Sequence, residues 1–239
     1  MRMRKKKHSA ERIAACSGYL ISDPAGSDPR LCFEKQSPLY LEIGCGKGDF
    51  ALGLANRNPD KNIVAVEKVP DVAMFALEKA AGLKPGPDRG EDPAVPGAHY
   101  GNIRFIIGDA VYIGDWFPPE SVERIYLNFS DPWPKKGYYK RRLTAPGFLE
   151  IYRKILIPGG ELHFKTDSQD LFDWSLDSFR NFGLELLFST RDLHSSEEAA
   201  GNIITEYEKR FSDAGMPIYS AHVRFPERLC SSERKTDES

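Results

Sequence analysis

The sequence predicts a single α/β domain built on a doubly wound, mostly parallel sheet. Short runs rich in β-branched and apolar residues alternate along the chain with stretches long enough for helices. The 239 residues are 41% hydrophobic and 28% charged, a composition that suits one large core. Strands that alternate with helices lie parallel and are joined by right-handed crossovers, which gives the expected topology.

The first part of the chain contains five expected strands and the helices that follow them. The strands are bounded by Gly, Asp and Pro, and we expect them at Leu39–Ile43, Ile63–Glu67, Ile103–Ile107, Arg124–Asn128 and Glu161–Thr166. We expect the helices at Asp49–Arg57, Val69–Gly82, Ala110–Phe117, Pro146–Leu156 and Ser168–Phe182.

The last part of the chain contains two further strands and a short helix between them. The strands are expected at Leu184–Phe188 and Pro217–Phe225. Thr205 and Glu208 have the spacing of a capping box, in which each side chain binds a backbone N–H of the other end of the turn. A helix is therefore expected to begin there and to end at Gly215.

Composition places the limits of the domain. Residues 1–30 are basic and polar, lack the apolar stretch of a signal peptide, and are expected to be disordered. The domain itself is expected to span 31–230, with a Pro/Gly/Asp-rich loop insertion at 84–101 and a disordered polar tail at 231–239. No apolar run approaches the roughly 18 residues that a membrane helix needs.

Charge and cysteine content restrict the function classes. The formal net charge is −2, so any contact with nucleic acid must come from local basic clusters. The four cysteines form no C-x-x-C pair and indicate neither a metal site nor a disulfide framework; they are Cys16, Cys32, Cys45 and Cys230. A reducing, cytoplasmic compartment fits this pattern best.

A glycine-rich loop with the spacing G-x-G-x-G follows the first expected strand, where open parallel sheets bind ligands. Gly44 begins it, and Glu42 lies just before it, so a carboxylate there would attract an ammonium group and repel phosphate. Glu67 ends the second strand, where a carboxylate can accept hydrogen bonds from ribose hydroxyls. Asp109 follows the third strand, where its side chain can reach an adenine edge. Together they indicate a nucleoside with a zwitterionic tail, the alternative being a tight turn with helix-capping acids. Here the chain resembles the class I S-adenosyl-L-methionine-dependent methyltransferases.

The segment after the fourth strand carries the expected chemistry. Asp131 is followed by Pro132 and Pro134, which stiffen the turn, and Trp133 offers a flat face on which a base could stack. Five of the eight residues from Lys135 to Arg142 are cationic, enough to bind phosphates in a salt-dependent way. Asp131 could also be a purely structural Asp-Pro turn.

This stretch resembles the bacterial tRNA (guanine-N7)-methyltransferase family from Asn128 to Lys136 and from Lys140 to Thr144. The resemblance extends to Glu42-Ile43-Gly44, Lys165-Thr166-Asp167 and Thr205-Glu206-Tyr207-Glu208. It implies a Rossmann-like class I fold, a seven-stranded sheet with an antiparallel C-terminal strand, and methylation of guanine 46 in the tRNA variable loop with S-adenosyl-L-methionine as donor and S-adenosyl-L-homocysteine as product. It also implies tRNA as partner, neither DNA nor a membrane, and a monomer or homodimer.

The resemblance assigns site residues. It makes Asp131 the catalytic carboxylate. It places the cofactor against Glu42, Gly44, Glu67, Asp109 and Asp131, and the substrate against Lys135, Asp167, Thr205, Glu206, Tyr207 and Glu208. The sequence departs from the family at Gly137-Tyr138-Tyr139, where Arg-His is usual, and in its longer 84–101 insertion.

Other interpretations remain open from sequence. Ser130-Asp131-Pro132-Trp133 is a near miss to the Asp/Asn-Pro-Pro-aromatic loop of amino-methyltransferases, and a non-catalytic RNA-binding protein on the same scaffold is a second alternative. The glycine spacing disfavours a nicotinamide oxidoreductase. His163 is expected to be a satisfied core residue, and Tyr207 either stacks on a base or fills the inner face of its helix. The basic N-terminus either holds tRNA or is a disordered end.

Overall fold

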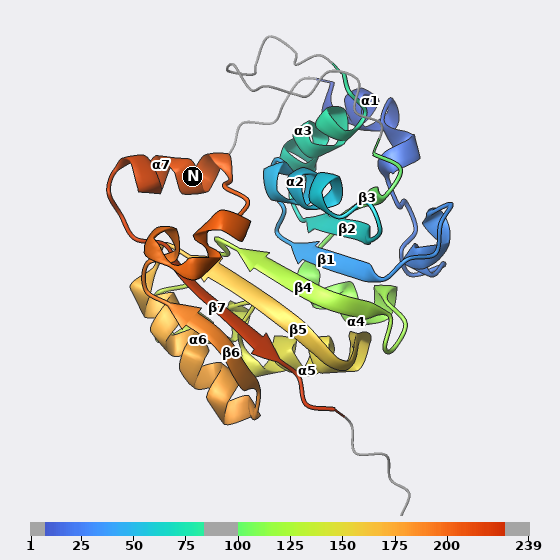
Figure 1. Ribbon diagram of the computed structural model, residues 1–239. Coiled ribbons are helices and arrows are strands. Elements are labelled where there is room, and N and C mark those ends of the chain that lie inside the picture. The colour runs from blue at the N-terminus through green and yellow to red at the C-terminus, as the bar shows by residue number, and fades with distance from the viewer. Residues whose placement is uncertain (1–7, 84–99, 228–239) are drawn as a thin grey trace, which may run out of the picture.

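The computed structural model describes residues 8–83 and 100–227, which form a single sheet with helices on both faces (Figure 1). The strand order is β3-β2-β1-β4-β5-β7-β6. The first five strands pair in parallel, and β7 runs antiparallel to both β5 and β6. Their bounds are β1 Leu39–Ile43, β2 Asn62–Glu67, β3 Ile103–Ile107, β4 Val122–Asn128, β5 Leu156–Thr166, β6 Glu185–Thr190 and β7 Tyr219–Arg224. The predicted α/β fold with an antiparallel C-terminal strand is confirmed.

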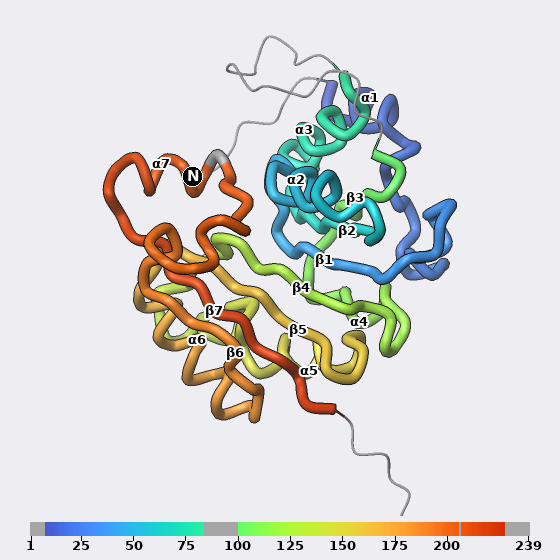
Figure 2. Tube along the Cα trace, viewed as in Figure 1, coloured from blue at the N-terminus to red at the C-terminus, as the bar shows by residue number. Residues whose placement is uncertain are grey.

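Helices cover the sheet unevenly (Figures 1 and 2). One group packs over β1–β3, namely α1 Ser9–Ala14, α2 Asp49–Arg57 and α3 Pro70–Ala80. Another lies on the opposite face, namely α4 Ile113–Trp116, α5 Pro146–Ile155 and α6 Gln169–Phe182. The last helix, α7 Glu206–Asp213, projects from the loop between β6 and β7. Six 3₁₀ turns complete the described secondary structure: Ser17–Tyr19, Pro29–Cys32, Ala110–Tyr112, Lys136–Arg141, Leu193–Ser195 and Glu197–Gly201.

Alternation along the strands divides the interior into two cores, because successive side chains of a strand point to opposite faces. Leu39, Leu41 and Ile43 of β1 belong to the core under α4–α6. Tyr40 belongs to the smaller core under α2 and α3. Glu42 shares the face of Tyr40, so the alternation itself directs this carboxylate towards α2 and the adjoining loop.

Local signals explain where the elements begin and end. Pro70 stands in the first turn of α3, where its missing N–H is harmless. The Ser168 hydroxyl accepts the Leu171 N–H to cap α6, and Gly183 ends that helix with a left-handed φ of 82°. The helix predicted at Ala110–Phe117 is instead a 3₁₀ turn followed by the four residues of α4. The Asp109 carboxylate, which accepts the Val111 N–H, closes the tighter turn.

The structure differs from the expected disorder of residues 1–30, because 8–30 are folded. Arg12 of α1 donates two hydrogen bonds to Glu78 of α3, at 2.6 and 2.8 Å. The Ile21 N–H bonds the Phe105 carbonyl of β3 at 2.9 Å, and Cys16 is buried. The Gly and Pro residues that suggested disorder form turns that lay the segment against the sheet edge. Residues 1–7, most of the 84–101 insertion and the 231–239 tail lie outside the described residues.

Within the described ranges, no helix combines the length and apolar character required to cross a membrane.

Candidate active site

The glycine loop between β1 and α2 exposes its backbone, without side chains, to a cavity of about 270 Å³. Gly44 and Gly46 have φ values of 82° and 56°, and a Cβ at either would meet no atom within 4 Å. The Gly44 N–H donates to the Val66 carbonyl at 2.8 Å, which ties the loop to β2. The open space beside two left-handed glycines allows a ligand to approach the backbone closely.

Glu42 presents an unsatisfied carboxylate oxygen beside this cavity. The residue is 2% exposed, and its Oε1 accepts the Asn128 Nδ2 at 2.9 Å. Its Oε2 is buried and has no partner within the described part of the chain. Burial raises the pKa of Glu42 to about 7, although the Asn128 bond opposes the shift. A buried orphan acceptor is costly, and a cationic group of a ligand would satisfy it.

Two more carboxylates stand at the ends of the neighbouring strands. Glu67 accepts the Gly46 N–H at 3.0 Å and the Val69 N–H at 2.8 Å, so its orientation is fixed while lone pairs remain for a ligand. Asp109 forms an ion pair with Lys68 at 2.5 Å, and this contact lowers the pKa of Asp109. The three acids therefore follow the strand ends in the order that a nucleoside with a charged tail requires.

The turn after β4 is strained and carries Asp131 into solvent. Phe129 and Trp133 have left-handed φ values of 54° and 42°, conformations that cost about 1–3 kcal/mol each for residues other than glycine. Asp131 is exposed and makes no hydrogen bond within the described part of the chain. Burial, together with the charges of Asp167 and Asp131, raises the pKa of the Tyr207 phenol, so these two acids flank that ring.

Helix α7 closes the cavity from the other side. Thr205 and Tyr207 line the same cavity as Glu42 and Gly44, so predicted substrate and cofactor residues meet in one place. The Tyr207 ring centroid lies 5.0 Å from that of Phe129 in the strained turn. The lining of this cavity does not include the other described residues that were predicted for the site, namely Glu67, Asp109, Asp131, Lys135, Asp167 and Glu208. The side chain of Glu206 lies outside the described residues.

Known proteins are similar to this chain in sequence over most of its length. A family profile described as "Putative methyltransferase" matches residues 36–221. A tRNA (guanine-N(7)-)-methyltransferase of Geobacillus sp. is 41% identical over 228 residues, covering 95% of this chain and 96% of its own. The enzyme of that name from Bacillus subtilis is 40% identical, covering 94% and 99%. The chain belongs to the tRNA (guanine-N7)-methyltransferase family.

Solved structures share the fold of this family member at low sequence identity. The 16S rRNA methyltransferase KamB superposes with a TM-score of 0.56 at 15% identity, over 82% of this chain and 90% of its own. A SAM-dependent methyltransferase of Methanosarcina mazei gives a TM-score of 0.53 at 12% identity, over 82% and 95%. These likenesses show the class I methyltransferase fold.

Glu208 is buried inside the protein, whereas the sequence analysis placed it against the substrate. It has no exposed surface, and its carboxylate accepts Lys165 Nζ at 2.6 Å and His194 Nε2 at 2.8 Å. Only half of the predicted capping box forms: the Thr205 hydroxyl accepts the Glu208 N–H at 3.0 Å, while the glutamate carboxylate binds inward. Lys165, which sequence reasoning did not single out, also donates to the Ile203 carbonyl at 2.9 Å and so ties α7 to β5.

The basic run of this family member is divided between surface and interior. Lys135, Lys136, Lys140 and Arg141 are exposed. Arg142 is 2% exposed, so the phosphate-binding set expected from sequence loses one member. The Arg141 guanidinium lies 5.0 Å from the Trp133 ring centroid and 4.9 Å from that of Tyr138. The tyrosine that replaces the usual family residue thus continues the aromatic surface beside Asp131.

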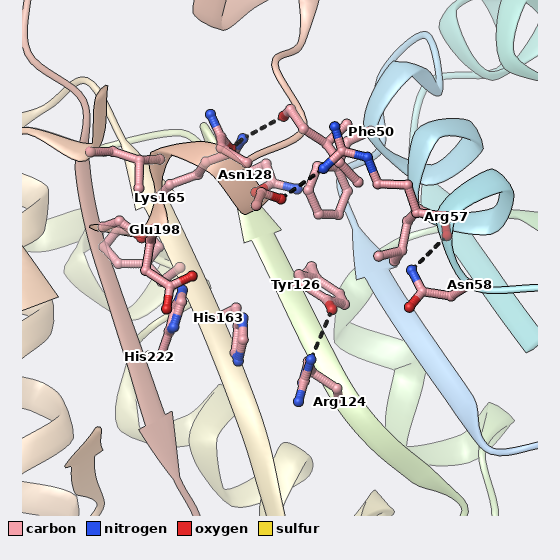
Figure 3. Close-up of a pocket in the computed structure, with 17 residues that line it drawn as sticks. Phe50, Arg57, Asn58, Arg124, Tyr126, Asn128, His163, Lys165, Glu198 and His222 are labelled. Carbon is pink, nitrogen blue, oxygen red and sulfur yellow. Dashed lines mark hydrogen bonds between the residues drawn. The ribbon is translucent and has the colours of Figure 1, made fainter. Parts of the chain in front are cut away.

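A second cavity, of about 380 Å³, lies on the sheet face that α2 leaves uncovered (Figure 3). His222, His163 and Tyr126 rise into it from the adjacent strands β7, β5 and β4. The two imidazoles stack with centroids 3.7 Å apart, and His163 binds Glu161 at 3.0 Å. Burial lowers the pKa of His222 to about 3. His163 is thus a hydrogen-bonded, partly buried residue.

Among residues 8–83 and 100–227, no three His, Cys, Asp or Glu side chains gather as metal ligands. Cys16, Cys32 and Cys45 are free thiols.

Proposed function

We propose that this protein methylates N7 of guanine 46 in the variable loop of tRNA. The observation that carries the proposal is the single cavity in which the glycine loop and Glu42 face Thr205 and Tyr207 of α7. The family membership and the shared fold support tRNA guanine N7 as the target. The exposed cations beside Asp131 supply the local positive charge that an RNA backbone needs in a chain of net charge −2. The working compartment would then be the cytoplasm that holds tRNA.

The residues at the strand ends fit the family's methyl donor, S-adenosyl-L-methionine. The orphan Oε2 of Glu42 would accept its ammonium, and the bare backbone at Gly44 would allow the amino-acid tail to lie close. Glu67 would accept the ribose hydroxyls, and Asp109 would face the adenine. When bound, the donor supplies an electrophilic methyl group on a sulfonium.

Asp131 orients the base for transfer. As the N7 lone pair forms its bond to the methyl carbon, the sulfur–carbon bond breaks and its electron pair stays on sulfur. Positive charge thereby moves onto the purine, and no proton needs to leave first. The exposed carboxylate of Asp131 can accept guanine N1–H and the exocyclic amine, and its charge stabilises the purine cation. Adenine lacks this pair of donors, which gives a physical source of discrimination.

The remaining predicted substrate residues divide by position. Lys135 would bind phosphate, and Asp167, Thr205, Glu206 and Tyr207 would surround the variable loop. Glu208 would serve the substrate indirectly, because it holds α7 from beneath.

The test is to incubate purified protein and labelled donor with an unmodified tRNA transcript and to analyse the digested nucleosides. We expect 7-methylguanosine, and none from a transcript in which adenine replaces guanine 46. Asp131→Asn keeps the shape of the turn but presents an amide to the base, so we expect turnover to fall about 10²- to 10³-fold with donor binding unchanged. Asp177→Asn on exposed α6 is the matched control. Label in another nucleoside, or full turnover by Asp131→Asn, would contradict the proposal.

A further inference from the structure

Two adjacent arginines of the basic run have opposite environments. Arg141 is exposed, whereas Arg142 is among the largest fully buried side chains. The guanidinium carbon of Arg142 lies 3.8 Å from the Tyr139 ring centroid and 4.7 Å from that of Trp174 on α6. No carboxylate pairs with it within the described part of the chain. Its charge therefore faces aromatic rings and backbone carbonyls, while its Nη1 is buried without a hydrogen-bond partner within the described residues.

The carbonyls that Arg142 binds belong to the residues directly after Asp131. Its Nε donates to the Pro132 oxygen at 2.9 Å, and one terminal nitrogen approaches the Trp133 oxygen at 3.5 Å. Trp133 is one of the two residues in this turn with a left-handed φ. Such a conformation persists only where the surroundings impose it. The guanidinium therefore contacts the strained backbone at Trp133, while the Phe129 N–H at the start of the turn donates to the Lys165 carbonyl at 2.9 Å.

We propose that Arg142 is a positioning residue that holds the turn after β4 so that Asp131 meets the guanine, an inference that rests on the proposed function. A planar guanidinium can reach two successive carbonyls while it also contacts two aromatic rings, a combination that suits a lysine ammonium less well. Tyr139 and Trp174 pack edge to face at 5.6 Å, so the same box joins the turn to α6. Arg142 thus acts on the reaction through Asp131 and contributes nothing to phosphate binding.

A positioning role and a phosphate-binding role for Arg142 predict different kinetics. If Arg142 positions Asp131, its loss lowers kcat and leaves tRNA affinity nearly unchanged, because the exposed cations remain. A misplacement of about 1 Å costs about 10²-fold in rate. If Arg142 bound phosphate, its loss would instead weaken tRNA binding and make the salt dependence shallower by about one unit of slope.

The experiment compares Arg142→Met and Arg142→Lys with Arg141→Met, measuring single-turnover methyl transfer and tRNA affinity at several salt concentrations. We expect Arg142→Met to lose about 10²-fold in rate with an unchanged salt slope. Arg142→Lys should recover part of the rate, and Arg141→Met should show the shallower slope. Unchanged turnover by Arg142→Met, or a loss confined to tRNA affinity, overturns the proposal.

A second measurement requires no turnover and separates this inference from the proposed function. Backbone hydrogen exchange of residues 129–134 in the protein without substrate should accelerate in Arg142→Met, with α2 and α3 unaffected. If Arg142→Met does not fold, Arg142→Lys and Trp174→Leu carry the same comparison, since each weakens the box without removing the turn. Exchange equal to that of the wild-type protein would show that Arg142 does not hold the turn, whatever reaction the protein catalyses.

Discussion

Glu42 is a carboxylate that the fold buries although one of its oxygens has no hydrogen-bond partner among the residues that the structure describes. Alternation along β1 directs it into the protein, where Asn128 satisfies one oxygen and the other has no partner. The raised pKa, about 7 against an ordinary 4.5, favours the protonated form in the folded protein. Its contribution to stability is present below pH 4.5 and is lost as the pH rises through 7. Above neutral pH, the buried Glu42 carboxylate therefore destabilises the protein, and a cationic ligand at its Oε2 would relieve this cost.

Glu42→Gln should reverse this relation. Without donor, the variant should melt at a higher temperature than the wild-type protein at pH 8.5, with the gain shrinking towards pH 4.5, because glutamine stays neutral. Donor affinity should fall about 10- to 100-fold, since a charged hydrogen bond contributes about 1.5–3 kcal/mol. Thermal scans and donor titrations at both pH values measure this, with Glu185→Gln on exposed β6 as control. Unaltered donor affinity would remove Glu42 from the binding site.

At the residue scale, sequence reasoning selected several residues that the structure brings together at one cavity. Glu42, Gly44, Thr205 and Tyr207 were singled out before their common cavity was visible. It could not foresee the burial of Arg142, because the box around that guanidinium includes Trp174, which is 32 positions further along the chain on α6. A run of like charges in sequence does not reveal which member points inward.

At the scale of the element, α7 is a short helix with a buried ionic anchor. Its eight residues would be marginal alone, so its place depends on tertiary contacts. Glu208 reaches Lys165 of β5 and His194 of the preceding loop. Opposing its burial, Lys165 and the hydrogen bonds hold the pKa of Glu208 below its usual range. Tyr207, one residue before Glu208, lines the cavity, so the Lys165–Glu208 ion pair also fixes where Tyr207 lies.

Glu208→Gln should leave the Lys165 ammonium buried without its counter-charge. Breaking one side of a buried pair costs about 3–5 kcal/mol of unfolding free energy. Because α7 loosens, KM for tRNA should rise more than the dissociation constant of the donor. Urea unfolding and steady-state kinetics test this, and Thr205→Ala, which removes the helix cap and leaves the ion pair, should cost about 1 kcal/mol of unfolding free energy. A larger loss in Thr205→Ala than in Glu208→Gln would show that the cap, not the ion pair, holds the helix.

Element boundaries were predictable where a turn residue marks them. β1, β3 and α2 have the predicted bounds because Gly, Asp and Asn stand at their ends. The folding of residues 8–30 escaped prediction because its partners are distant in sequence, as with Arg12 and Glu78. The second half of the capping box failed for the same reason: Lys165 competes successfully for Glu208.

At the scale of the whole molecule, the sheet carries a polar, partly open face over β4, β5 and β7. His222 is held neutral there beside His163, Arg124, Glu161 and Tyr126, and its pKa of about 3 lies below the ordinary 6.5. The unfolded chain therefore binds the additional proton between these pH values. Stability falls as the pH falls through that window. Glu42 acts in the opposite direction between pH 7 and 4.5, so the two groups partly offset each other.

His222→Phe should flatten the acid side of the stability profile. The variant lacks the group that takes up a proton on unfolding, so its free energy of unfolding should decline less than that of the wild-type protein between pH 7 and 5. The difference between the two proteins cancels the contribution of Glu42. Urea denaturation across this range provides the measurement, with His8→Gln, which alters an exposed histidine, as control. Parallel profiles would mean that His222 is not held neutral.

The placement of β7 between β5 and β6 has a consequence for biosynthesis. This strand, second from the sheet edge, is translated after both of its neighbours, and α7 lies in the connection between β6 and β7. Until β7 emerges from the ribosome, the nascent chain has two unpaired strand edges and no fixed support for Tyr207. The half that carries Glu42, Glu67 and Asp109 can condense much earlier, because β1–β4 and their helices precede β7 in the sequence. An enzyme of this topology would then be able to bind its donor before it is able to bind tRNA. Stalled translation products would expose unpaired strand edges, which are prone to aggregation and are bound by chaperones.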